Sequence, residues 1–98
     1  MDKEQVIEIV RRYKKLVSEI HKDAQVYLYG SYNNGYARAD SDIDVAVIIP
    51  HRTGNWFADV PPLWKASRQV NSLIEPVLME QNEHTPLYDN VIRTGTRI

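Results

Sequence analysis

The sequence predicts an α/β or α+β fold, in which helices pack on one small mixed β-sheet. Three observations lead to this prediction. The chain has 98 residues, of which 43% are hydrophobic, so there is room for one core and for one domain covering residues 1–98. Helix-like and strand-like segments alternate from one end of the chain to the other. No internal repeat or low-complexity tract interrupts that order.

The first half of the chain predicts one helix and two strands. Apolar residues recur at the helical spacing i, i+3, i+4, i+7 between residues 3 and 21. "QVYLYG" is rich in aromatic and branched residues and predicts a strand that stops at Gly30. "IDVAVIIP" predicts a second strand, which Pro50 closes.

The second half continues the alternation. "HRTGNWFADVPP" contains Gly, Asn, Asp and a Pro pair, so it predicts a connection without regular structure. "PLWKASRQVN" has helical spacing, and "SLIEPVLM" predicts a third strand. Thr85 followed by Pro86 indicates the start of a last helix over residues 86–94, and Gly95 indicates its end.

Composition excludes several classes of function. The formal charge is −1, with 12 basic and 13 acidic residues mixed along the chain, so neither a nucleic-acid partner nor a membrane partner is expected. The absence of cysteine excludes disulfides and thiolate chemistry. The N-terminal stretch lacks the apolar core of a signal peptide, and a cytoplasmic location is the default expectation. The three histidines have no metal-ligand spacing.

Two aspartates at the head of the second strand are the first candidate site residues. Asp42 and Asp44 are two positions apart, and strand side chains alternate between faces, so both carboxylates are expected on one side. Ile43 between them would point into the core. Two adjacent carboxylates repel, and the simplest relief is one or two hard cations such as Mg²⁺.

The turn after the first strand is the second candidate feature. Glycine at position 30 lets the backbone approach a ligand closely, and Ser31 adds a hydroxyl to it. N–H groups of the following turn can face an anion. A metal site beside a phosphate-holding turn is the apparatus of phosphoryl or nucleotidyl transfer.

Gly30-Ser31, ten intervening residues and Asp42-Ile43-Asp44 resemble the GS-x10-DxD signature of the DNA polymerase β-like nucleotidyltransferases, and "GS…G.AR.DSDIDV" is similar to their minimal nucleotidyltransferase (MNT) branch. The resemblance covers nearly the whole chain and implies a single nucleotidyltransferase domain. It implies that Glu75, in "LIEPVLM", is the third acid, where the family often has aspartate. Pro76 after it is a departure that removes a ladder hydrogen bond. Asn33 is a second departure, because the family commonly has a small alanine there.

The resemblance also implies a reaction. AMP would pass from ATP to an acceptor hydroxyl, with Asp42 and Asp44 holding Mg²⁺ and the Gly30-Ser31 turn holding the β- and γ-phosphates. Glu75 would complete the metal site, with two ions expected, or take the acceptor proton. An ordinary exposed strand position remains the alternative for Glu75. Arg38 would reach the triphosphate or would simply solvate its loop.

The identity of the acceptor is left open between three possibilities. Minimal members of this branch typically act as the antitoxin of a toxin–antitoxin pair with a helical HEPN-type protein, which predicts transfer to that partner. The alternatives are a non-catalytic antitoxin that acts by occlusion, and transfer to a small hydroxylated molecule such as an aminoglycoside. The candidate anchors for a partner are Trp56, Phe57 and Trp64. The partner can also be a second copy of this chain, as a homo-oligomer. On the first strand, Tyr27 and Tyr29 share a face and are expected to pack under the site.

Overall fold

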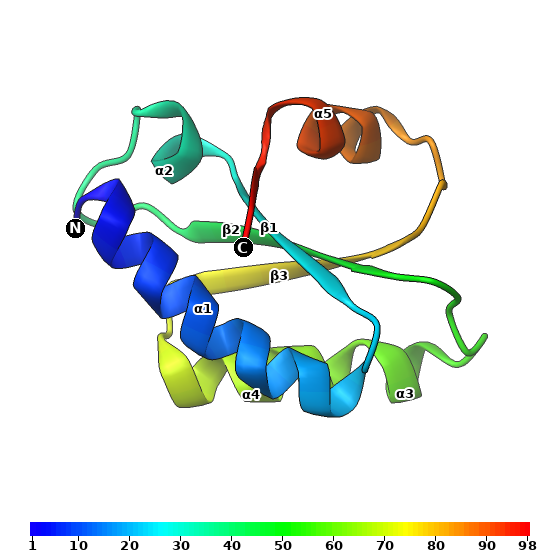
Figure 1. Ribbon diagram of the computed structural model, residues 1–98. Helices are drawn as coiled ribbons and strands as arrows, with labels where there is room; N and C mark the ends of the chain where they lie inside the picture. Colours follow the sequence, from blue (N-terminus) through cyan, green and yellow to red (C-terminus); the bar gives the residue numbers. More distant parts are fainter.

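The computed structural model describes residues 1–98 and contains one four-stranded sheet with five helices around it (Figure 1). The elements follow in the order α1 (Lys3–Ile20), β1 (Gln25–Tyr29), α2 (Ser31–Asn34), β2 (Ile43–Ile49), α3 (Trp56–Asp59), α4 (Pro61–Val70), β3 (Ile74–Glu80), α5 (Pro86–Thr94) and β4 (Thr96–Arg97).

The sheet is mixed, with the strand order β3-β2-β1-β4. β1 pairs antiparallel with β2 and with β4, whereas β2 and β3 are parallel. The parallel pair needs a crossover, and α3 and α4 supply it on one face of the sheet. The mixed sheet and the helices packed on it confirm the predicted fold class.

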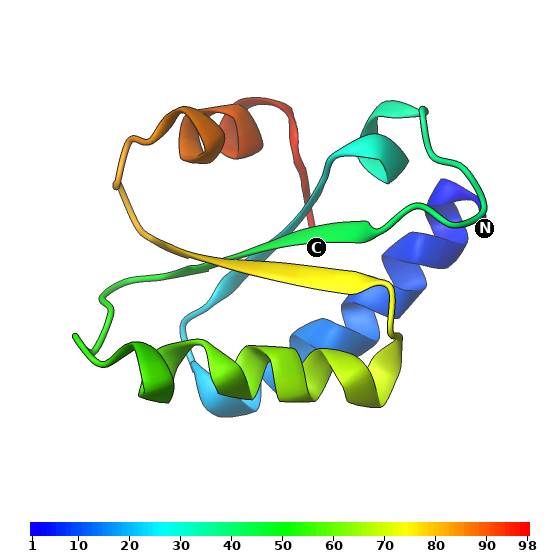
Figure 2. The same ribbon diagram turned by 180° about the vertical axis from the view of Figure 1, so that it is seen from behind.

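The two faces of the sheet are covered unequally. α1 and α4 lie together under one face, while α5 and the short α2 lie on the other side, as both views show (Figures 1 and 2). A cluster of fifteen buried residues fills the α1 and α4 side. Only five buried residues form the cluster beneath α5: Ala46, Ile48, Met79, Tyr88 and Val91. The α5 face therefore has little apolar packing, and polar groups can lie on it near the ends of the strands.

Local sequence signals explain where the longer helices begin and end. Asp2 caps α1 by accepting from the Gln5 backbone N–H, and the Gln5 side chain accepts in return from the Asp2 backbone N–H. Thr85 caps α5 by accepting from the Tyr88 N–H, and Gly95 follows its last residue. The predicted bounds of these helices are confirmed within one residue.

Three short elements, α2, α3 and β4, differ from the sequence prediction, which gave the residues after Gly30 only as a turn. The connection after β2 contains the helical turn α3, because the Asn55 side chain accepts from the Phe57 N–H and caps it. β4 was not predicted at all. It consists of Thr96 and Arg97 and pairs with Leu28 and Tyr27 of β1, so it exists only through that tertiary pairing. No helix in the structure is both long enough and apolar enough to cross a bilayer.

Candidate active site

Asp44 lies at the centre of a row of three side chains across the sheet. In the strand register it stands opposite Tyr29 of β1 on one side and Glu75 of β3 on the other. Residues that pair directly across strands project from the same face. That face is the one under α5, because Ala46, two positions along β2, belongs to the α5 cluster. Glu75 therefore faces the same side as Asp44.

The carboxylates around Asp44 form a concentrated negative charge. Burial raises the pKa of Asp44, and the charges of Glu75 and Asp42 raise it further. Asp42 immediately precedes β2 and is exposed, and Glu75 is exposed on the edge strand. An acid with this raised pKa is more easily neutralised, by a proton or by a cation bound between the carboxylates.

Gly30 brings the turn after β1 directly against Asp44. It has φ of 77°, and a Cβ built on it would lie 2.2 Å from the Asp44 Oδ2 atom. The positive φ and the close approach to Asp44 each favour glycine. Any other residue here would require a local shift of the structure. The turn and Asp44, which are far apart in the sequence, thus lie side by side in the structure.

The loop between the turn and β2 is held by its own residues. Tyr32 is buried, and its hydroxyl donates to the Arg38 carbonyl at 3.2 Å. The Arg38 N–H in turn donates to Ser41 Oγ at 2.7 Å. These contacts fix the loop through its backbone, whereas the Arg38 side chain is exposed and its guanidinium forms no ion pair. Ser31 is the first residue of α2, and its hydroxyl caps no helix.

Asn33 and Pro76, the two departures from the family pattern, both have a structural explanation. Asn33 Nδ2 donates to the Thr94 carbonyl at 2.9 Å, and its Oδ1 accepts from the Thr96 hydroxyl, so this side chain joins α2 to the turn before β4. Pro76 lies on the edge strand, where one side of the backbone has no partner strand. The β2–β3 pairing runs without interruption from Ile43↔Ile74 to Ile49↔Glu80.

The residues present fit Mg²⁺ when it is carried in with a nucleotide. No three His, Asp or Glu side chains converge closely enough to form a complete set of metal ligands. Mg²⁺ prefers hard oxygen ligands and usually takes one or two from carboxylates, with waters and substrate phosphates completing its shell. The carboxylate of Asp44, close enough to Asp42 and Glu75 for their charges to raise its pKa, can supply one or two such ligands together with them.

Tyr29 is a site residue that the sequence predicted only as packing. It does pack against the α5 cluster, as expected. Burial, followed by the charges of Asp44 and Glu75, raises the pKa of Tyr29 to about 12. The Tyr29 hydroxyl therefore stays protonated at neutral pH. Only the register of β1 against β2 reveals this, since sequence spacing says nothing of which residues face each other across strands.

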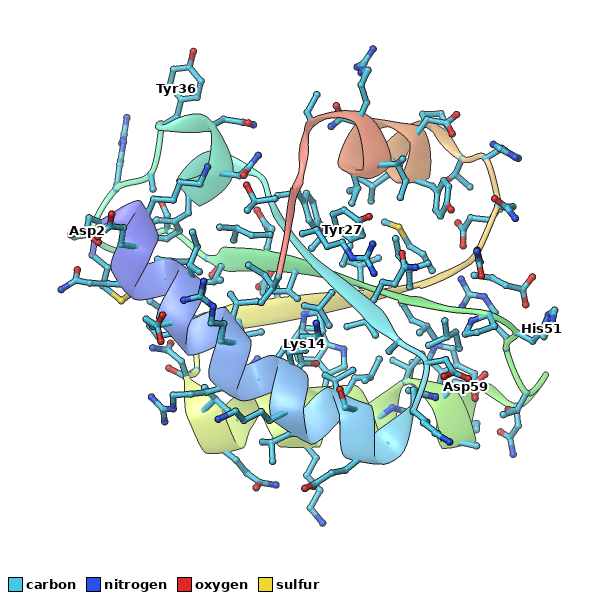
Figure 3. The ribbon with its side chains drawn as sticks, viewed as in Figure 1. Asp2, Lys14, Tyr27, Tyr36, His51 and Asp59 are labelled. Atoms are coloured by element: carbon cyan, nitrogen blue, oxygen red, sulfur yellow. The ribbon has the colours of Figure 1, made fainter.

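Trp56 and Phe57, two of the three aromatic residues predicted as anchors for a partner, lie away from Asp44. Trp56 and Phe57 are exposed by 59% and 78% and belong to α3, which follows the far end of β2. α2 and α3 are at opposite ends of the molecule in both ribbon views (Figures 1 and 2). Figure 3 shows the same separation, with Tyr36 beside α2 and with His51 and Asp59 at the other end. Trp56 and Phe57 are therefore remote from the carboxylates, and their role as anchors for a docking partner stays a prediction.

Comparison with known proteins defines the class. The chain belongs to the nucleotidyltransferase domain family, whose model matches residues 10–91. It is similar to a "Putative protein adenylyltransferase" of Methanocaldococcus jannaschii, at 29% identity over 106 residues, covering 96% of this chain and 99% of the relative. A second protein of the same description and organism is 26% identical over 82 residues, covering 84% of this chain and 82% of the relative.

Solved structures share the fold. A crystal structure of a toxin–antitoxin with AMP-PNP matches with a TM-score of 0.66 and 24% identity, covering 89% of this chain and 69% of that one. A crystal structure described as a "putative nucleotidyltransferase" from Sulfolobus solfataricus matches with a TM-score of 0.52 and 20% identity, covering 95% of this chain and 83% of that one. The fold predicted from the resemblance is therefore confirmed.

Replacing Gly30 tests the contact between the turn and the carboxylate. Gly30→Ala should abolish nucleotide binding and destabilise the fold by roughly 1–3 kcal/mol, because the new methyl group displaces Asp44 or the turn. Gly35→Ala is the control, since Gly35 has φ of 81° but a Cβ there meets nothing within 4 Å. Urea unfolding and titration with ATP and Mg²⁺ measure both effects. Equal losses in the two variants would contradict the contact.

The raised pKa of Asp44 predicts a pH-dependent effect of Asp44→Asn on stability. With EDTA present, the variant should be more stable than wild type at neutral pH, because the buried charge is removed. As pH falls, the folded wild type takes up a proton before the unfolded chain does, so wild type gains stability and the difference disappears. Thermal unfolding between pH 7 and about pH 4 measures this. The exposed Asp40→Asn is the control, and a variant that is less stable at neutral pH would contradict the prediction.

Proposed function

We propose that residues 1–98 form one nucleotidyltransferase domain that transfers AMP from ATP, with Mg²⁺, to a hydroxyl group of a partner protein. The observation that carries the proposal is the position of Gly30, where a Cβ would lie 2.2 Å from Asp44 Oδ2. This contact supports the proposal, because a glycine backbone can approach a phosphate closely and the neighbouring carboxylate is a ligand of the kind that hard cations prefer. Glu75 stands in register beside that carboxylate.

Each site residue has a role in the proposed reaction. Asp42 and Asp44 would hold Mg²⁺, which neutralises charge on the attacked phosphate and on the departing pyrophosphate. The first N–H groups of α2 have no partner inside so short a helix, and with the Ser31 hydroxyl they would hold the β- and γ-phosphates. The unpaired guanidinium of Arg38 is on the loop that follows and would contact the same phosphates.

The bond changes define what Glu75 would do. The acceptor oxygen forms a bond to the α-phosphorus of ATP while the bond from that phosphorus to the bridging oxygen breaks, and pyrophosphate leaves. The hydroxyl proton must be removed as the new bond forms. Glu75 is exposed and lies beside Asp44, which supports a role either in accepting that proton or in completing the metal site.

The shape of the site favours a macromolecular acceptor. A small ligand is usually held in a pocket that buries most of its surface. None of the surface cavities is lined by Asp42, Asp44 or Glu75, which argues against an enclosed aminoglycoside. The description of both relatives as protein adenylyltransferases and the toxin–antitoxin fold neighbour support a protein acceptor. We therefore propose a helical HEPN-type toxin as the partner and an antitoxin role for this chain, in the cytoplasm.

Removing the aspartate pair tests whether the protein is an enzyme. Purified partner, this chain, ATP and Mg²⁺ should yield partner molecules carrying one or more AMP units, measured by intact mass. The double variant Asp42→Asn, Asp44→Asn should lower the rate roughly a hundredfold or more, because both metal ligands are lost. Asp40→Asn, an exposed acid of the same loop, is the matched control. If the double variant still neutralises the toxin and no AMP is added by wild type, the antitoxin acts by occlusion.

Ser31 and Glu75 should affect different kinetic parameters. Ser31→Ala removes one hydrogen bond to phosphate and should weaken ATP binding by about 1 kcal/mol with kcat nearly unchanged. Glu75→Gln should lower kcat by about 100-fold with a smaller change in ATP affinity, as expected for loss of a base. Steady-state kinetics at varied ATP concentration separates these effects. Wild-type activity in Glu75→Gln would show that the proton is taken elsewhere.

A further inference from the structure

Asn33 joins three segments that are far apart in the sequence. Its Nδ2 atom donates to the Thr94 carbonyl at 2.9 Å, and its Oδ1 atom accepts from the Thr96 hydroxyl. Its backbone carbonyl accepts from Lys3 Nζ at 3.4 Å. The Thr94 carbonyl can only accept, so the Asn33 side-chain amide must turn its NH₂ group toward Thr94. Its oxygen then faces the Thr96 hydroxyl, which donates to it. One side chain thus connects α2 with both ends of the turn between α5 and β4.

Two of the segments that Asn33 joins, α2 and β4, are too short to be stable on their own. α2 has four residues, and the glycines that flank it have φ values of 77° and 81°, so its conformation depends on tertiary contacts. β4 has two residues, and its pairing with β1 is extended only by the Ile98 N–H donating to the Val26 carbonyl at 2.9 Å. Tyr32 of α2 and Ile98 after β4 each pack on the large core, and the Ile98 carbonyl also accepts from Lys14 Nζ at 2.8 Å. Apart from these anchors both segments are short, and short segments open at lower free energy than core strands. A contact between them therefore makes each more ordered when the other is in place.

We propose that Asn33 is a positioning residue that couples the Gly30-Ser31 turn to the docking of β4, so that nucleotide binding and the ordering of the C-terminal strand strengthen each other. This inference rests on the proposed function, because it needs the turn to hold the nucleotide. Gly95 supports the coupling, since a Cβ there would lie 3.3 Å from the Leu28 carbonyl. The turn before β4 thus packs on β1 two residues before Gly30.

The coupling changes the affinity for ATP and does not change the rate of the chemical step. When the turn is only partly ordered in the free protein, the apparent Kd rises by the inverse of the ordered fraction. The bound state is the same, so kcat does not change. Coupling between two equilibria is reciprocal. If docking of β4 raises the affinity for nucleotide by some factor, bound nucleotide must raise the equilibrium constant for docking of β4 by the same factor.

The test compares Asn33→Ala with the matched control Asn34→Ala, the exposed next residue of α2, whose replacement keeps both contacts to the C-terminal turn. AMP-PNP with Mg²⁺ is the probe. In wild type and Asn34→Ala, it should slow hydrogen exchange at the Ile98 N–H. In Asn33→Ala, this protection should be lost, and the Kd for AMP-PNP and the KM for ATP should rise roughly fivefold with kcat unchanged.

Thr96→Val provides a second, milder variant in case Asn33→Ala folds poorly. It removes the hydroxyl from the other side of the contact and should raise the same Kd, and the double variant should fall short of the sum of the two effects. If Asn33→Ala speeds exchange at Ile98 but leaves the Kd and the nucleotide-dependent protection as in wild type, the contact is merely structural and the coupling is overturned. If wild type itself does not bind AMP-PNP, the proposed function fails and the coupling fails with it.

Discussion

The contact between Gly30 and the carboxylate of Asp44 is the constraint on which the site depends. β1 and β2 are antiparallel neighbours, and Tyr29 pairs with Asp44, so the chain that leaves β1 at Gly30 starts directly beside that carboxylate. A side chain at this position would force Asp44 or the turn to shift, because a Cβ would overlap Asp44 Oδ2. Residues 31–42 must then return the chain to the head of β2, and the hydroxyl of buried Tyr32 holds this segment by donating to the Arg38 carbonyl.

The second constraint is electrostatic. The fold keeps three carboxylates close enough that two of them, with burial, raise the pKa of the third, Asp44. Such an arrangement opposes folding of the free chain, because like charges are held together and one of them is partly desolvated. A structure selected only for stability would not keep it. Strain of this kind is typical of functional sites, where a ligand supplies the compensating charge.

The unequal covering of the sheet explains how those charges are tolerated. The face under α1 and α4 has the large core, and Tyr13 donates to the Leu63 carbonyl at 2.8 Å to join the two helices. The α5 face needs only a small cluster for its packing, so the ends of β1, β2 and β3 remain free to carry Asp44, Glu75 and Tyr29. The large core and the candidate site residues thus lie on opposite faces of one sheet.

The sequence by itself determined the order of the main elements, the cap of α5 and the nucleotidyltransferase family. These depend on local periodicity, on capping residues and on a motif of fixed spacing, all of which are readable along the chain. Only the tertiary structure decided that Glu75 faces Asp44, that Tyr29 lies beside both, that Asn33 reaches Thr94 and Thr96, that β4 exists, and that Trp56 and Phe57 lie at the far end. The reason is that strand register and contacts between distant segments are set by how the core packs, and local periodicity does not encode them.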